Sequence, residues 1–140
     1  MVEIIAGEKG TGKTKTLITK ANDAALLTSG SIVFLDKNNK HMYELSNQIR
    51  MINATEFHID SFDMFRGFLY GIVSQNWSLD AIFLDSFLTI AHVEDVSKLQ
   101  DYIDFLEAIS KEHNLRIIVS VSADKNQLPE AIHKYISVAL

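Results

Sequence analysis

Gly7-Glu8-Lys9-Gly10-Thr11-Gly12-Lys13-Thr14 is the stretch that decides the fold of this chain. It fits the pattern G-x-x-x-x-G-K-[ST] at every fixed position. The apolar run 2–6 before it predicts a short buried strand, and the residues from Lys13 to about Thr28 predict a helix after it. A strand, a glycine-rich loop and a helix in this order form the context that a phosphate-binding loop requires.

The residue types of the loop suit a polyanion. We expect Gly7, Gly10 and Gly12 to supply positive φ angles and close approach, so that backbone N–H groups can surround phosphate oxygens. The start of the following helix adds unpaired N–H groups and the positive end of its dipole. We expect the Lys13 ammonium to reach the β- and γ-phosphates and the Thr14 hydroxyl to bind Mg²⁺. The residues predicted to bind the nucleotide are Gly7, Glu8, Lys9, Gly10, Thr11, Gly12, Lys13, Thr14 and Lys15.

Composition narrows the possible function classes. The 140 residues, 47% hydrophobic and 22% charged, predict a single domain, 1–140, with ordinary globular composition. A net charge of −5 argues against tight nucleic-acid binding by this domain alone. The chain has no cysteine, which excludes disulfides and thiol catalysis, and its five histidines show no i, i+4 pair for a metal. The start Met1-Val2-Glu3 lacks signal-peptide features and no apolar stretch is long enough for a membrane span, so we expect a cytoplasmic protein.

Strand and helix patterns alternate along the chain. Apolar runs predict further strands at 31–36, 56–60, 80–86, 115–121 and 135–140. Helices are expected from about 40, with Met42, Leu45 and Ile49 inward, from Asp60 or Ser61, from Asp95 to His113 and near Glu130, and Gly30 is expected as the left-handed cap of the first helix. Residues 87–93 fit no element, and Phe87 and Leu88 could be core or a partner contact. The alternation predicts an α/β fold with a mostly parallel sheet of about five strands and helices on both faces.

Two acids at the ends of apolar strands are candidates for the second half of the site. Ligands of such sheets bind at the carboxyl ends of the strands, so Asp36, Asp85 and Ser122 can converge with the loop. We expect Asp85 to bind Mg²⁺, directly or through water, beside Thr14. Asp36 has two interpretations, a general base for the attacking water or a structural acid that holds the turn at 37–39. The candidate catalytic residues are Lys13, Asp36 and Asp85.

The loop and the two acidic strand ends together resemble the RecA-like branch of the P-loop NTPases, which includes recombinases, hexameric helicases and pilus-retraction-type ATPases. SIVFLD, 31–36, resembles the second core strand of that branch, and LDAIFLDS, 79–86, resembles its metal-site strand. The resemblance implies ATP and Mg²⁺ as cofactors, and a protein partner or a homo-oligomer. It also implies a basic residue from a neighbouring subunit, for which the candidates are Arg50, Arg66, Arg116 and Lys125, with Lys125 better placed. We expect a single domain without the extra domains with which recombinases and helicases hold DNA.

The sequence departs from that branch at the positions that would support fast hydrolysis. Asn38 stands where the branch has a catalytic Glu, and Ser86 follows Asp85. The strand ending near Ser122 lacks a γ-phosphate-sensing Gln or Asn, for which Ser120 or Ser122 is a weak substitute. We therefore expect a slow or partner-stimulated Mg²⁺-dependent ATPase. A non-hydrolysing nucleotide sensor is the alternative, followed by a small nucleoside or nucleotide kinase, against which the chain has only three Arg and no Arg-rich lid. The choice between ATP and GTP stays open.

Overall fold

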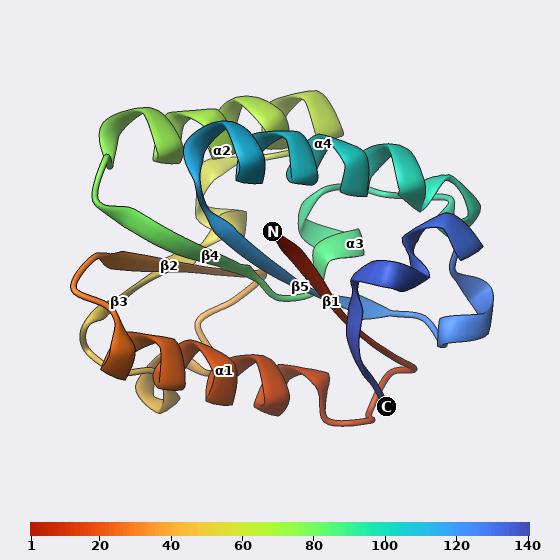
Figure 1. The fold of residues 1–140 in the computed structure, drawn as a ribbon, viewed down its shortest axis with the longest axis horizontal. Coiled ribbons are helices and arrows are strands. Elements are labelled where there is room, and N and C mark those ends of the chain that lie inside the picture. Colours follow the sequence, from red (N-terminus) through yellow and green to blue (C-terminus); the bar gives the residue numbers. More distant parts are fainter.

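A six-stranded parallel sheet forms the centre of the computed structural model, which describes all 140 residues, Met1 to Leu140. The strand order is β3-β2-β4-β5-β1-β6, and every neighbouring pair is parallel (Figure 1). The strands are β1 (Val2–Gly7), β2 (Ser31–Asp36), β3 (Ile49–Asn53), β4 (Leu79–Leu84), β5 (Arg116–Ser122) and β6 (Ile136–Ala139). The α/β fold with a parallel sheet is thus confirmed, with six strands where about five were expected.

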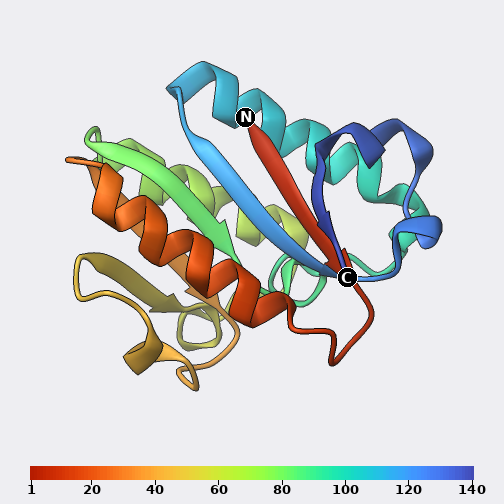
Figure 2. The same ribbon diagram turned by 60° about the horizontal axis from the view of Figure 1, so that its bottom comes forward.

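Helices cover both faces of this sheet. The helix α1 (Lys13–Leu27) lies on one face, and α2 (Phe62–Gln75) and α4 (Leu99–His113) lie on the other (Figures 1 and 2). A short helix, α3 (Phe87–Ile90), follows β4. The 3-10 helices are η1 (Met42–Glu44), η2 (Ala54–Phe57), η3 (Val96–Lys98), η4 (Lys125–Gln127) and η5 (Glu130–Tyr135). None of the helices combines the length and the apolar character needed to cross a bilayer.

The continuous apolar runs of the strands fill two core layers, because the sheet is covered on both faces. In β2, Ile32 and Phe34 pack in the layer under α1, while Val33 and Leu35 pack in the larger layer under α2 and α4. The ring of Phe34 stacks on that of Phe83 in β4, with centroids 6.2 Å apart. Full burial of such a side chain contributes about 1.5–3 kcal/mol, so the two layers fix the strand order that positions the site.

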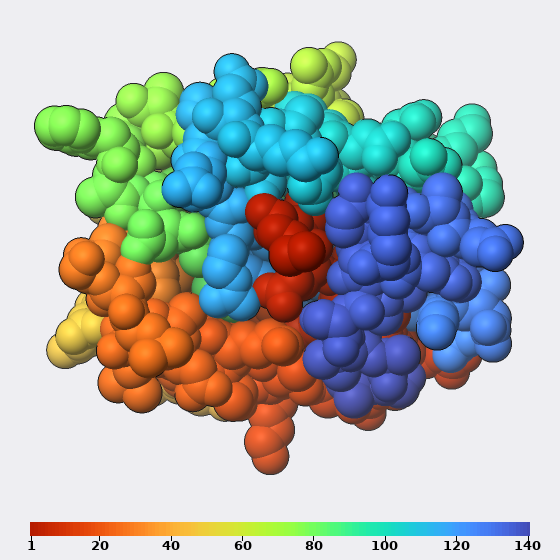
Figure 3. Space-filling model, in the orientation of Figure 1, coloured from red at the N-terminus to blue at the C-terminus, as the bar shows by residue number.

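The N-terminus is tied to the sheet at its amino edge. The terminal ammonium of Met1 donates hydrogen bonds to the Ser110 hydroxyl and, at 3.0 Å, to the carbonyl oxygen of Leu115. Figure 3 shows the first residues, in red, enclosed between the segment around α4 and the C-terminal segment. Because β1 is anchored at this edge, its other end carries the glycine-rich loop to the opposite edge of the sheet.

The segment 40–60 differs from the sequence prediction. The helix expected from about 40 is wrong, because only η1 forms and the chain then enters β3 at Ile49. Leu45 and Ile49 are buried as predicted, but Met42 is 42% exposed. The strand expected at 56–60 is also wrong, since η2 and a turn occupy these residues. The edge strand is instead the preceding β3, which pairs with β2 alone.

Some helix ends follow local signals, whereas α4 starts at Leu99 without a side-chain cap and the expected start Asp95 caps η3 instead. The Ser61 hydroxyl accepts a hydrogen bond from the Met64 N–H at 3.1 Å, and Asn114 has φ 54°, as expected for a start and a stop signal. Gly30 is not a left-handed cap, because α1 ends at Leu27 and its cap residue is Thr28, in extended geometry. A Cβ at Gly30 would lie 2.5 Å from the carbonyl oxygen of Ser78, so glycine is required there for close approach of two turns.

The unassigned residues 87–93 begin with α3. Phe87 is fully buried and meets Phe65 edge to face at 5.9 Å. Leu88 is half-buried and packs against the same core layer. The core interpretation of both residues is therefore the one that the structure supports, and their burial fixes the turn that follows Asp85.

Candidate functional site

The loop between β1 and α1 depends on its glycines in two different ways. Gly10 has φ 84° and Gly12 has φ 91°, a conformation that strains any L side chain. Gly7 does not have the positive φ that was expected, but a Cβ there would lie 2.5 Å from Thr11 Oγ1. Thr11 is held in this position because its hydroxyl donates to the Glu8 carbonyl oxygen at 2.7 Å. Gly10 and Gly12 are thus required for their left-handed backbone conformation and Gly7 for close packing. Because these three residues have no side chains, they leave the loop backbone uncovered.

Lys13 is the first residue of α1 and lies inside this loop. Its side chain is 7% exposed, and its ammonium donates to the Glu8 carbonyl oxygen at 2.9 Å. Burial lowers the pKa of Lys13, the charge of Asp85 opposes this effect, and the charge of Lys37 adds to it. The helix starts at Gly12 without a side-chain cap, so its first N–H groups face the loop without a side-chain acceptor.

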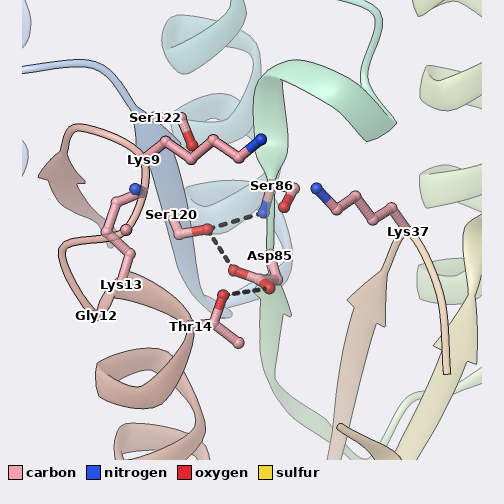
Figure 4. A pocket seen from close by; sticks show the side chains of 10 residues that line it. Lys9, Gly12, Lys13, Thr14, Lys37, Asp85, Ser86, Ser120 and Ser122 are labelled. Carbon is pink, nitrogen blue, oxygen red and sulfur yellow. Dashed lines mark hydrogen bonds between the residues drawn. The ribbon is translucent and has the colours of Figure 1, made fainter. Parts of the chain in front are cut away.

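Asp85 is a buried carboxylate with hydrogen bonds on both oxygens. It directly follows β4 and is 3% exposed. Oδ2 accepts from the Thr14 hydroxyl at 2.9 Å, and Oδ1 accepts from the Ser120 hydroxyl at 2.6 Å (Figure 4). The Ser120 oxygen in turn accepts from the Ser86 N–H at 2.8 Å. Since β5 lies between β4 and β1 in the sheet, Ser120 occupies the position between Asp85 and the loop.

Asp36, at the end of β2, is more buried and less well paired. It is 1% exposed, its Oδ1 accepts from the Lys37 N–H at 2.6 Å, and its Oδ2 has no hydrogen-bond partner. Burial raises the pKa of Asp36, repulsion from Asp85 raises it further, and the hydrogen bond from Lys37 partly offsets both. The turn-holding contact expected for Asp36 is present, and one oxygen remains for another partner.

A polar cavity of about 290 Å³ brings most of these residues together at the carboxyl ends of the strands (Figure 4). Its lining consists of Lys9, Gly10, Gly12, Lys13, Thr14, Lys37, Asp85, Ser86, Ser120 and Ser122, and none is hydrophobic. Six residues of the predicted site are in this set. The predicted residues that do not line the cavity are Gly7, Glu8, Thr11, Lys15 and Asp36.

Lys37 is the lining residue that the sequence analysis missed. The candidate basic residues were instead Arg50, Arg66, Arg116 and Lys125, and none of these lines the cavity. Arg116 pairs with Glu3 at 2.8 Å, at the opposite edge of the sheet. The signal for Lys37 was available, since it follows a strand that ends at the same edge as the loop.

The net charge of the cavity lining is positive, whereas that of the whole chain is negative. Three lysines and one carboxylate line the cavity, whereas the whole chain carries a net charge of −5. A concave site with excess positive charge and exposed backbone N–H groups concentrates anions. The chemistry that this arrangement supports is therefore the binding of a compact polyanion.

The oxygen donors in the cavity fit a hard divalent cation only when other ligands complete its shell. The Thr14 hydroxyl and the Asp85 carboxylate are adjacent oxygen donors. The chain contains no group of three or more His, Cys, Asp or Glu side chains that could hold a metal. Mg²⁺ is commonly held by one or two carboxylates together with phosphates and water, so the donor set fits Mg²⁺ that arrives with a phosphate ligand.

The fold and the site define the class of this protein as α/β, with a six-stranded parallel sheet consistent with a RecA-like core. Among solved structures, the chain is similar to the flagellar accessory protein FlaH from Methanocaldococcus jannaschii, with a TM-score of 0.56 and 17% sequence identity. The match covers 95% of this chain and 65% of the FlaH chain, so this chain spans less than two thirds of that structure. At this identity the likeness shows the fold alone. No family model and no curated protein sequence matches the chain.

Proposed function

We propose that this chain is a P-loop protein that binds a nucleoside triphosphate with Mg²⁺ and hydrolyses its β–γ phosphoanhydride bond slowly or on stimulation by a partner. The observation that carries the proposal is the cavity, in which a glycine-rich loop, a helix N-terminus, three lysines and the Thr14–Asp85 pair meet without any apolar residue. A triphosphate places several negative charges in a small volume, and these are the groups that bind it.

In this proposal, Lys13 binds the β- and γ-phosphates. Its ammonium now donates to the Glu8 carbonyl oxygen at 2.9 Å, a contact that phosphate oxygens would replace. Burial lowers the pKa of Lys13, and a nearby polyanion would favour its charged form again. The same charge would stabilise the negative charge that develops during transfer to water.

Thr14 and Asp85 would hold the metal side of the nucleotide. Bound Mg²⁺ would supply charge neutralisation on the β- and γ-phosphate oxygens. Asp85 is oriented for this role because Ser120 fixes its Oδ1 and leaves Oδ2 toward Thr14, 2.9 Å away. A carboxylate held by neighbouring hydrogen bonds loses little freedom when it binds a metal.

Asp36 is the candidate acceptor for a proton from the attacking water. Its Oδ2 has no partner, and its raised pKa brings it closer to the range useful for a general base. Asp36 does not line the cavity, however. Asn38, which stands where a catalytic Glu is expected, accepts a hydrogen bond from the Lys40 N–H on its Oδ1 at 2.9 Å. Slow hydrolysis follows from this arrangement, because Asp85 is the lone carboxylate in the lining.

A non-hydrolysing nucleotide sensor is the second candidate function. The same observation favours it, since no carboxylate other than Asp85 reaches the cavity. In either function, the cavity has no apolar surface on which the nucleobase of the nucleotide could stack. A protein partner or a second copy of this chain would supply that surface. Because no lining residue is assigned to the nucleobase, ATP and GTP are equal candidates for the bound nucleotide.

Calorimetry with the purified chain tests this proposal, using ATP, GTP and ADP with and without Mg²⁺, together with an assay for phosphate release. Lys13→Ala is expected to abolish triphosphate binding, whereas Lys20→Ala, on the same helix but outside the cavity, is expected to bind normally. Mg²⁺-dependent phosphate release that Asp85→Ala removes would identify the ATPase, and binding without release would identify the sensor. Folded wild-type protein that takes up no triphosphate would reject both.

A further inference from the structure

The proposed function counts Lys37 among the three lysines of the cavity but gives it no individual role. It follows Asp36 at the carboxyl end of β2, and its N–H donates to Asp36 Oδ1 at 2.6 Å. This contact fixes the backbone from which the side chain leaves. Figure 4 shows the side chain pointing toward Asp85 and Ser86 and into the cavity.

The strand order puts Lys37 on the wall opposite the loop. Three strand spacings separate β2 from β1, because β5 and β4 lie between them. At about 4.8 Å for each spacing, the two strand ends lie about 14 Å apart. Lys9 and Lys13 therefore enter the cavity from one side and Lys37 from the other, with Asp85 between them (Figure 4).

Lys37 forms no salt bridge in the structure, and its charge acts on the carboxylate of the adjacent Asp36. The ammonium groups of Lys37 and Lys13 belong to the same cavity, which their side chains enter from different sides. Two cations that face each other over a polar cavity favour an anion that reaches both.

We propose that Lys37 binds the terminal phosphate of the nucleotide and makes this site select triphosphates over diphosphates. This inference rests on the proposed function. In this arrangement the loop and Lys13 bind the phosphates that lie nearest β1, and Thr14 and Asp85 hold the metal. Lys37 binds the terminal phosphate, which extends past Asp85 toward β2. Among the lining residues, Lys37 is the basic residue that follows β2, since Lys9 lies in the loop and Lys13 starts α1.

Paired titrations of the purified chain with ADP and with a triphosphate whose β–γ linkage resists hydrolysis test the proposal, both with Mg²⁺. Lys37→Met should weaken triphosphate binding about tenfold, the size of one charge-assisted hydrogen bond, and leave ADP binding unchanged. Lys37→Arg should restore the preference, since it keeps the charge. Lys40→Met, on the same turn and exposed but outside the cavity, is the matched control and should behave as wild type.

The outcomes separate this inference from the proposed function. If wild type binds neither nucleotide, the nucleotide site itself is refuted and the role of Lys37 with it. If wild type binds both and Lys37→Met lowers both affinities equally, or lowers neither, nucleotide binding stands and the selection by Lys37 is refuted. A loss of triphosphate preference in Lys40→Met as large as that in Lys37→Met would also refute it.

Discussion

β2 and β4 end in the same three residue types, Phe-Leu-Asp, but the two aspartates differ in their hydrogen bonds. Phe34-Leu35-Asp36 and Phe83-Leu84-Asp85 lie side by side, with Phe34 paired to Phe83 and Leu35 to Leu84. Both aspartates are at most 3% exposed. Asp85 nevertheless accepts hydrogen bonds on both oxygens, whereas Asp36 keeps one oxygen without a partner and has a raised pKa.

The difference comes from the neighbours of each strand. On one side of β4 lies β5, which supplies Ser120, and α1, on one face of the sheet, supplies Thr14. On the outer side of β2 lies β3, which ends in Asn53 opposite Asp36. The Asn53 side chain turns to its own backbone, where it accepts from the Thr55 N–H at 3.1 Å. A strand-end acid thus has hydrogen bonds on both oxygens or keeps one oxygen without a partner, according to which strand lies beside it.

The largest effect that would sharpen this comparison is on Mg²⁺-dependent nucleotide binding. Asp85→Asn replaces an acceptor oxygen with an NH₂ group, which conflicts with the hydroxyl of Thr14 or of Ser120. We expect a loss of about a hundredfold in Mg²⁺-dependent nucleotide affinity, the upper end of effects from altered metal-site ligands and their supports. Asp36→Asn should keep the affinity and slow turnover if Asp36 is the proton acceptor. Titration calorimetry and single-turnover phosphate release measure the two effects.

Asp80→Asn is the control, because Asp80 lies at the other end of β4 and is exposed. It should change neither quantity. Equal losses of affinity in Asp85→Asn and Asp36→Asn would break the comparison, since they would show that the two carboxylates act as one metal site.

The residues around Asp85 could be predicted because local patterns determine most of them. The loop motif placed Lys13 and Thr14, and the rule that parallel strands end at a common edge brought Asp85 to them. Ser120 was named only as a weak phosphate sensor. Its actual position beside Asp85 depends on β5 lying between β4 and β1, a pairing that no local pattern of the sequence encodes.

The region beyond Asp36 was predicted less well for a physical reason. The edge strand β3 is mostly half-buried and short, so its alternation is weak beside the helical spacing of Leu45 and Ile49. Gly30 was assigned to a helix cap from its position alone, whereas the approach of the turn at Ser78 is what requires it. Long-range packing decides both cases, and the sequence pattern does not contain it.

An intermediate effect is expected from the hydroxyl that distinguishes the two acids. Ser120→Ala removes the donor to the buried Asp85 Oδ1 and leaves the partly buried Ser86 N–H without its acceptor. We expect the free energy of unfolding to fall by about 2 kcal/mol, since buried groups left unpaired lose about 1–3 kcal/mol. Urea unfolding followed by far-ultraviolet circular dichroism measures this, because Trp77 is fully exposed and is a poor fluorescence probe.

Ser122→Ala serves as the matched control on the same strand. Ser122 is exposed, so the change in the free energy of unfolding should stay within about 0.5 kcal/mol. Losses of the same size in both variants would contradict the assigned role of Ser120, because they would reflect the strand end in general and not support of Asp85.

The smallest expected effect concerns Asp36, the less well paired of the two aspartates. It is the contribution of Asp36 to the pH dependence of the free energy of unfolding. Because the folded-state pKa of Asp36 is raised above its ordinary value of 3.8, the folded protein binds this proton more tightly than the unfolded chain. The stability that this group contributes is fully present below the ordinary value and is lost as pH rises through the folded-state pKa. Asp36→Asn cannot lose a proton, and its amide oxygen can still accept from the Lys37 N–H.

Asp36→Asn should therefore be more stable than wild type near pH 7, and this gain should shrink as pH falls toward the ordinary value of 3.8. Other carboxylates titrate in both proteins, so the difference between their urea unfolding curves isolates Asp36. A gain that stays constant with pH would mean that packing and not charge separates the two side chains. A gain that grows toward low pH would mean that the folded state favours the ionised form of Asp36, which would contradict its raised pKa.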